Sequence, residues 1–128
     1  AQPERRVICL NGDGSTLMCL GSLVTFTQST APNYTLVITE NGTYEVTGNQ
    51  PVPGAGTVDF GGMARAAGLK TVYTIDDPAD FEAKLDLHFE SEGPAVFVWR
   101  LERGEEPVPR PERPICERSH ALRAALVG

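Results

Sequence analysis

Two short polar clusters in the sequence carry side chains that could bind a metal and a phosphate group. Asn11-Gly12-Asp13-Gly14-Ser15 directly follows a short apolar run, and Asn41 follows the next one. The glycines let the backbone approach a ligand closely, and a helix that starts near Ser15 would offer free N–H groups to a phosphate. Asp13 would repel phosphate unless a cation lay between them, and Mg²⁺ binds in this way through few protein oxygens plus phosphate oxygens. With the Asn41 amide oxygen as a second ligand, these residues indicate a metal-bridged diphosphate.

Other interpretations of the Gly-Asp-Gly stretch differ in how well they fit its spacing. A turn without a ligand stays open, because Asp-Gly dipeptides are common in turns. A calcium loop with Gly14 as its sixth residue would place Cys9 and Leu20 at ligand positions, and neither can bind calcium. The stretch lacks the third glycine of the dinucleotide-binding GxGxxG pattern, and no GK[ST] follows it as in a P-loop.

The elements that must position these clusters alternate between strand and helix patterns, which predicts an α/β domain with a parallel β-sheet flanked by helices. The apolar segments that predict strands are residues 6–10, 34–40, 71–75 and 94–101. The first of them is continuously apolar, so we expect it to be covered on both faces. Ligands of parallel sheets bind beyond the carboxyl ends of the strands, so the clusters at 11–15 and 41–44 should share one edge.

The predicted helices are recognised by their capping residues and apolar spacing. The first begins with Ser15 as N-cap and continues to Val24, with apolar residues on nearly every side, so we expect it to be almost entirely buried. The second is capped by Asp59, ends at Gly68, and has one face formed by Phe60, Met63, Ala64 and Ala67. The third spans 78–91, with a stripe of Phe81, Leu85 and Phe89. The remaining segments are a long loop at 41–58, an extended proline-rich arm at 104–114 and a short terminal helix at 117–127.

The composition is that of a single globular domain of 128 residues. No apolar run approaches the ~18 residues of a membrane span, and the start AQPERRV lacks the apolar centre of a signal peptide. Cys9, Cys19 and Cys116 form no CxxC pair, which favours reduced and mostly buried thiols in a cytoplasmic protein. A net charge of −6 argues against nucleic acid as a partner. We assign no catalytic role to His88 and expect Trp99 to pack against the sheet.

GDGS followed by ENGTY resembles the bipartite thiamine diphosphate signature, in which an asparagine-containing turn follows GDG. The resemblance is to the cofactor-binding domain of thiamine-diphosphate-dependent decarboxylases, and most of all to the sulfopyruvate and phosphonopyruvate decarboxylase group. It runs from about residue 5 to the C-terminus and is carried by GDGSTLMCLGSLVT, APNYTLVITENGTYEVTGNQ, VDFGGMARAAGL and RPERP. It implies thiamine diphosphate and Mg²⁺ as cofactors.

The resemblance also implies roles for individual residues. Asp13 and Asn41 match side chains that bind Mg²⁺, and Thr43 falls where the family supplies a backbone carbonyl to the metal. The positions that match diphosphate contacts are Gly14 and Ser15, and Gly12 is a further cofactor-binding position. Candidates for substrate contact are Tyr44 and Thr47. One departure is Glu40, which stands where the family has the first of two asparagines.

A second departure concerns the start of the domain. In the family a helix and further backbone precede the GDG strand, whereas twelve residues precede Asp13 here, so the usual N-terminal segment is expected to be missing from this sequence or to belong to a longer chain. The resemblance implies a 2-oxo acid decarboxylase whose catalytic glutamate lies on a pyrimidine-binding partner subunit or domain, in a homo- or hetero-oligomer. An acetolactate-synthase-like carboligase and a non-catalytic subunit that keeps the fold are the alternatives.

Overall fold

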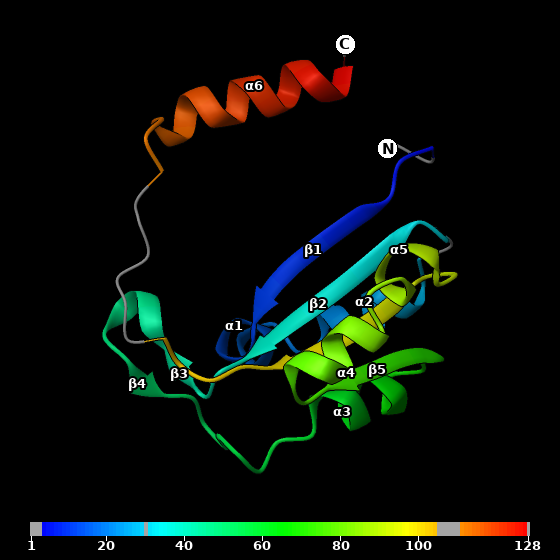
Figure 1. The fold of residues 1–128 in the computed structure, drawn as a ribbon, viewed down its shortest axis with the longest axis vertical. Helices are drawn as coiled ribbons and strands as arrows, with labels where there is room; N and C mark the ends of the chain where they lie inside the picture. The colour runs from blue at the N-terminus through cyan, green and yellow to red at the C-terminus, as the bar shows by residue number, and fades with distance from the viewer. Residues whose placement is uncertain (1–3, 30, 105–110, 128) are drawn as a thin grey trace.

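A four-stranded parallel sheet forms the centre of the domain (Figure 1). The computed structural model describes residues 4–29, 31–104 and 111–127. Strand order across the sheet is β1-β2-β6-β5, with bounds β1 (Val7–Gly12), β2 (Tyr34–Glu40), β5 (Thr71–Ile75) and β6 (Ala95–Arg100). The predicted α/β class is therefore confirmed, and all four strands lie at the predicted places.

Short helices and one small hairpin connect these strands. The helices are α1 (Asp13–Met18), α2 (Ser22–Thr27), α3 (Phe60–Ala66), α4 (Pro78–Ala83), α5 (Leu87–Glu90) and α6 (Ile115–Val127). Within the segment predicted as a loop, β3 (Thr43–Tyr44) and β4 (Gln50–Pro51) pair in antiparallel fashion around a 3₁₀ turn, η1 (Glu45–Thr47). The loop prediction for 41–58 missed this hairpin, because two-residue strands are too short to show a periodic pattern.

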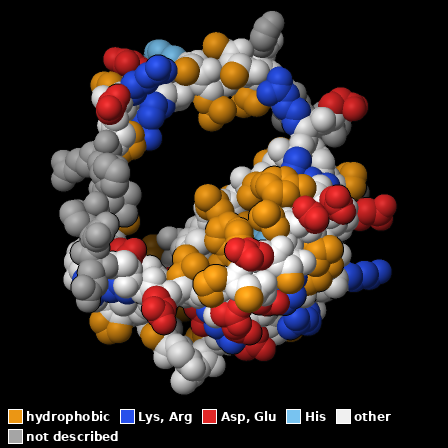
Figure 2. Space-filling view, viewed as in Figure 1, with side chains coloured by type: hydrophobic (Ala, Val, Ile, Leu, Met, Phe, Trp, Pro, Cys, Tyr) orange, Lys and Arg blue, Asp and Glu red, His pale blue; other side chains and the backbone are white. Residues whose placement is uncertain are grey.

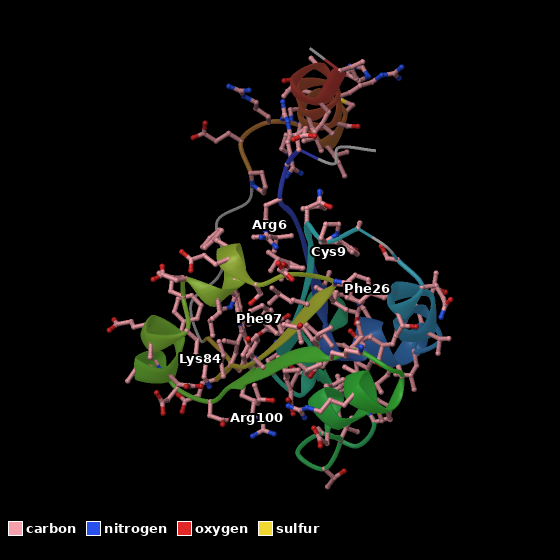
Figure 3. All side chains as sticks on the ribbon, turned by 90° about the vertical axis from the view of Figure 1, so that its right-hand side faces the viewer. Arg6, Cys9, Phe26, Lys84, Phe97 and Arg100 are labelled. Atoms are coloured by element: carbon pink, nitrogen blue, oxygen red, sulfur yellow. The ribbon has the colours of Figure 1, made fainter. Side chains whose placement is uncertain are left out.

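The sheet is packed on both faces. On one face, Leu23 and Phe26 of α2 and Phe60 and Ala64 of α3 pack against apolar residues of β2 and β6. On the other, Phe97 lies within a cluster completed by Phe81 and Leu87 of the α4–α5 segment, and Figure 3 shows Phe97 in the middle of the domain. These two clusters hold the strand ends in place.

His88 and Trp99 form a polar pair inside the second cluster. The indole Nε1–H of Trp99 donates to Nε2 of His88 at 2.9 Å, while Nδ1 of His88 lies 3.1 Å from the Lys84 carbonyl oxygen. Because Nε2 accepts, the proton of the neutral ring is on Nδ1 and donates to that carbonyl. The His88 ring also stacks on Phe97, with centroids 3.8 Å apart. Trp99 thus packs against the sheet, as the sequence predicted, and His88 packs beside it.

The predicted cap at Asp59 is confirmed, and Asp77 caps the next helix in the same way. The Asp59 side chain accepts the N–H of Gly62 at 2.8 Å, and the Asp77 side chain accepts the N–H of Asp80 at the same distance. Gly68 follows α3 with a φ of +109°, a conformation that favours glycine. The predicted face of α3 is also confirmed, since its apolar residues face the core.

The prediction of one buried helix from Ser15 to Val24 is wrong. The chain forms two short helices separated at Cys19–Gly21, and the N-cap of the first is Gly12, so Ser15 lies inside α1 and is exposed. Met18 is 77% exposed. The helices meet the sheet with one side, and the apolar residues on their other side remain open to solvent in this chain.

The prediction that the first strand is covered on both faces is also wrong. β1 pairs with β2 alone and forms an edge of the sheet, and Leu10 is 65% exposed. Figure 2 shows hydrophobic side chains gathered over this strand on the visible face. The α4–α5 segment packs over β5 and β6, which leaves the β1 part of that face uncovered.

Three further expectations need correction or restriction. The predicted helix 78–91 is split into α4 and α5, so Leu85 and Phe89 of its stripe are exposed while Phe81 packs in the core. The thiols are not mostly buried: Cys9 is half-buried, and Cys19 and Cys116 are exposed. Residues 105–110 of the predicted arm lie outside the described residues.

The last described element is α6, which begins two residues before its predicted start. All of its described residues are exposed, and Figure 1 draws it apart from the sheet. Across the described ranges 4–29, 31–104 and 111–127, no helix has the length and apolar character that crossing a membrane requires.

Candidate functional site

The two predicted polar clusters come together at the carboxyl edge of the sheet. β1 and β2 are adjacent and parallel, and their register places Gly12 beside Thr39. Asp13 therefore begins α1 next to the point where Asn41 leaves β2. This neighbourhood follows from parallel pairing of two consecutive strands, which the sequence pattern predicted.

Asp13 joins the turns that follow the two strands. Its side chain is buried, with 3% of the residue exposed. Oδ1 accepts the N–H of Gly14 at 2.7 Å, and Oδ2 accepts the N–H of Gly42 at 2.7 Å. A carboxylate offers about four lone-pair sites, so these two bonds leave acceptor capacity on both oxygens.

Asn41 shapes the second turn. Its Oδ1 accepts the N–H of Thr43 at 3.0 Å, the local bond of an Asx-turn. Gly42, between them, has a φ of +72°, which a side chain would strain. The Thr43 hydroxyl oxygen is buried and has no hydrogen-bond partner among the described residues. The turn therefore presents polar atoms that the protein itself does not fully satisfy.

A cleft of about 710 Å³ lies over these turns. Its lining includes every residue that the sequence predicted for the site: Gly12, Asp13, Gly14, Ser15, Asn41, Thr43, Tyr44 and Thr47. Asn11 is used differently, because its side-chain amide donates to the Thr16 hydroxyl at 3.0 Å and that hydroxyl donates to the Gly12 carbonyl. The structure thus brings the predicted residues into one cavity.

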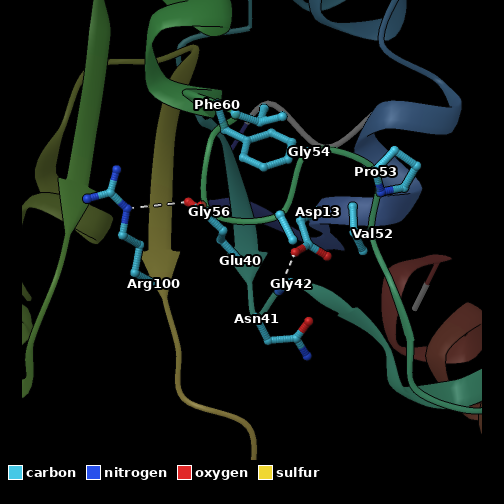
Figure 4. A pocket seen from close by; sticks show the side chains of 12 residues that line it. Asp13, Glu40, Asn41, Gly42, Val52, Pro53, Gly54, Gly56, Phe60 and Arg100 are labelled. Atoms are coloured by element: carbon cyan, nitrogen blue, oxygen red, sulfur yellow. Dashed lines mark hydrogen bonds and ion pairs between the residues drawn. The ribbon is translucent and has the colours of Figure 1, made fainter.

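A second, smaller cleft of about 230 Å³ is also lined by Asp13 and Asn41 (Figure 4). Glu40 and Arg100 line it, with Glu40 Oε2 and Arg100 Nε 3.5 Å apart. At that distance the two side chains form an ion pair but no hydrogen bond, so Glu40 Oε2 has no hydrogen-bond partner among the described residues. Arg100 also contacts Asp76 Oδ1 at 2.7 Å.

The groups around Glu40 shift the pKa of its carboxyl in opposite directions. Burial raises the pKa of its carboxyl, the Arg100 guanidinium lowers it, and the negative charges of Asp13 and Asp59 raise it further. The net result is a raised pKa. The pKa of Arg100 is raised too, chiefly by its hydrogen bond to Asp76.

The link from Glu40 through Arg100 to Asp76 was missed in the sequence. These residues end or follow β2, β6 and β5, which are neighbours in the sheet but distant along the chain. The signal available was that each of these three strands ends in a charged residue or is directly followed by one. Glu40, Arg100 and Asp76 meet because β2, β6 and β5 are neighbours in the sheet, and the sequence pattern does not predict this strand order.

The donor set fits a hard divalent cation that also binds phosphate. It consists of one buried carboxylate, one amide oxygen and a turn with a buried, unpaired hydroxyl. Within the described part of the chain there is no cluster of three or more His, Cys, Asp or Glu side chains that could hold a metal. A cation at Asp13 would depend on ligand oxygens from outside the protein, which is the usual situation for Mg²⁺.

Comparison with known proteins agrees with this geometry. A family model described as "Thiamine pyrophosphate enzyme, C-terminal TPP binding domain" matches residues 1–99. The chain belongs to this family. The sequence resemblance to thiamine-diphosphate enzymes is therefore confirmed.

Several relatives of this thiamine pyrophosphate (TPP) binding domain have names that state an activity. Sulfopyruvate decarboxylase subunit beta of Methanocaldococcus jannaschii is 42% identical over 95 residues, which cover 74% of this chain and 50% of that protein. The subunit beta of Methanothermobacter thermautotrophicus is 36% identical over 83% of this chain and 54% of its own length. Phosphonopyruvate decarboxylase of Streptomyces hygroscopicus is 33% identical over 73% of this chain and 23% of that protein.

The fold has a counterpart among solved structures. A protein from Mycobacterium smegmatis, described as a thiamin diphosphate-dependent enzyme, superposes with a TM-score of 0.62 at 25% identity. The match covers 79% of this TPP-binding domain and 19% of that chain. The present chain also spans about half the length of the sulfopyruvate decarboxylase subunits that it matches.

Proposed function

We propose that this chain is the diphosphate- and Mg²⁺-binding half of a thiamine-diphosphate-dependent 2-oxo acid decarboxylase of the sulfopyruvate or phosphonopyruvate type. The observation that carries the proposal is the position of Asp13. Its buried carboxylate joins the turns after β1 and β2 and faces the cleft that all the predicted site residues line. The decarboxylase names of the relatives support the reaction class.

Each residue has a defined part in this proposal. Asp13, the Asn41 side chain and the Thr43 backbone carbonyl would hold Mg²⁺, and the Gly12–Ser15 turn would bind the diphosphate oxygens that complete the metal's ligand set. When bound, thiamine diphosphate supplies an electron sink for the electrons released with CO₂. The chain's own contribution is to hold and orient the charged end of the cofactor.

A partner completes the proposed enzyme. Two of the named relatives are called subunit beta, which supports an assembly with a second subunit. We propose that this partner, or a second domain, binds the aminopyrimidine ring and provides the catalytic glutamate. Such an oligomer would work in the cytoplasm, as the sequence predicted.

Calorimetric titration with thiamine diphosphate, in Mg²⁺ and in EDTA, tests the binding part. Asp13→Ala should weaken binding at least about tenfold in Mg²⁺ and lose the gain in affinity that Mg²⁺ gives the parent over EDTA. Asp86→Ala is the matched control, since Asp86 is an exposed carboxylate that lines neither cleft. Equal affinity of the parent and Asp13→Ala in Mg²⁺ would contradict the metal site.

Turnover tests the reaction part. The protein with its partner subunit should release CO₂ from sulfopyruvate or phosphonopyruvate. Carbon–carbon bond formation between two 2-oxo acids would instead favour a carboligase of the acetolactate synthase type. Cofactor binding without turnover of any 2-oxo acid would favour a non-catalytic subunit.

A further inference from the structure

The aromatic ring of Tyr44 lies directly on Gly14. A Cβ atom placed on Gly14 would be 2.2 Å from Cε1 of Tyr44, 2.7 Å from Cζ and 2.8 Å from Cδ1. Those distances are shorter than any that real Cβ atoms adopt, so the ring occupies the space of the missing side chain. Gly14 is also absent from the glycines with positive φ, so its backbone does not require glycine. The ring is what requires it.

The hairpin that carries Tyr44 has few other attachments to the domain. All residues from Glu45 to Pro51 are exposed. Its hydrogen bonds among the described residues are internal: Asn49 N–H donates to the Tyr44 carbonyl at 2.9 Å, and the Gln50 side-chain amide donates to the Thr47 carbonyl at 3.3 Å. At its base, Val52 N–H donates to the Gly42 carbonyl. The Tyr44 ring therefore anchors the hairpin to α1.

Tyr44 directly follows Thr43, whose backbone carbonyl is a proposed Mg²⁺ ligand. The N–H of Thr43 is already fixed by the Asn41 side chain at 3.0 Å. A ring seated on Gly14 fixes the following residue as well, so the Thr43 carbonyl is held from both sides. Loss of the ring would free the hairpin and, with it, this carbonyl.

We propose that Tyr44 is a positioning residue of the cofactor cleft, whose ring on Gly14 holds the β3–β4 hairpin and the Thr43 carbonyl in place. This inference rests on the proposed function and deepens it. It gives Tyr44 a role through Thr43, in place of the substrate contact expected from the sequence. It also explains why position 14 is a glycine although its backbone conformation does not demand one.

The contact itself is tested without any cofactor. In the full protein, amide hydrogen exchange over residues 43–51 should be about tenfold faster in Tyr44→Ala than in the parent, with an unchanged thermal unfolding midpoint. Tyr44→Phe keeps the ring and should match the parent. Gly14→Ala should accelerate exchange as Tyr44→Ala does, and the double variant should be no faster than either single one, because both remove one contact. Unchanged exchange in Tyr44→Ala, or additive effects in the double variant, would overturn the contact.

Calorimetry with thiamine diphosphate and Mg²⁺ tests the role in binding. Tyr44→Ala should bind about tenfold more weakly in Mg²⁺ and need more Mg²⁺ for half-saturation, whereas Tyr44→Phe should bind as the parent does. Tighter binding by Tyr44→Ala would show that the ring obstructs the cleft and would overturn the inference. If the parent binds the cofactor and Tyr44→Ala binds it with the same affinity, this inference alone would be overturned. Failure of the parent to bind the cofactor would overturn the proposed function and this inference together.

Discussion

The Asp13 carboxylate accepts the backbone N–H of Gly42 through Oδ2 at a distance of 2.7 Å. With the second bond to the Gly14 N–H, one buried side chain connects the end of β1 to the end of β2. The candidate site is therefore built before any ligand binds, because the same atoms that would face a cation already set the two turns.

Asp13→Ala should destabilise the cofactor-free protein by about 2–4 kcal/mol, because hydrogen bonds to a charged group are lost and two N–H groups are left unpaired in a buried place. Urea unfolding followed by circular dichroism measures the change. The exposed Asp86→Ala should stay within about 0.5 kcal/mol of the parent. A similarly small effect of Asp13→Ala would show that the carboxylate does not support the turns.

Two neighbouring residues of α2 should respond very differently to truncation. Leu23 is 2% exposed and Val24 is 56% exposed. Leu23→Ala should cost about 2–5 kcal/mol in the free energy of unfolding, since it leaves a cavity in the core. Val24→Ala should cost less than about 1 kcal/mol. Equal losses at both positions would restore the fully buried helix that the sequence suggested and contradict the observed orientation of α2.

His88→Ala should lower stability by about 2–4 kcal/mol, because it removes the stacking of the buried His88 ring on Phe97 and leaves the half-buried Trp99 N–H without its acceptor. Phe89→Ala, one residue further along and exposed, is the control and should have little effect. Thermal and urea unfolding measure both. If Phe89→Ala is the more damaging variant, the predicted stripe of Phe81, Leu85 and Phe89 was right after all.

Stability at alkaline pH should depend on Tyr34. The pKa of Tyr34 is raised from 10.0 to about 12, chiefly by burial and to a lesser extent by the hydrogen bond and the charge of the Cys9 thiol. Since the folded pKa lies above the unfolded one, the stabilising contribution is complete below pH 10 and is lost as pH rises towards 12. The urea midpoint of the parent should therefore fall more steeply over this range than that of Tyr34→Phe. Parallel curves would show that Tyr34 ionises equally in both states.

Much of the fold and the meeting of the site residues could be predicted from local sequence. Strand patterns and turn residues are local signals, and parallel pairing of two consecutive strands is enough to bring Asp13 beside Asn41. The caps at Asp59 and Asp77 are equally local, since each side chain bonds an N–H three residues ahead.

The parts that failed depend on what lies next to each element. Leu10 and Met18 have the apolar character of core residues, yet β1 is an edge strand and α1 is covered on one side only. The sequence pattern shows which residues are apolar, whereas their burial depends on which other elements pack against them. Likewise, the contact between Tyr44 and Gly14 joins a hairpin to a helix, and no periodic signal marks either partner.

The position of Trp99, which is fixed by its hydrogen bond to His88, has a practical consequence. Trp99 is the single tryptophan of the sequence, so the fluorescence produced by selective excitation of tryptophan comes from one known place. That place is the end of β6, one residue before Arg100, whose guanidinium reaches Glu40 beside the cleft. The chain thus carries an intrinsic optical reporter near the carboxyl edge of its sheet.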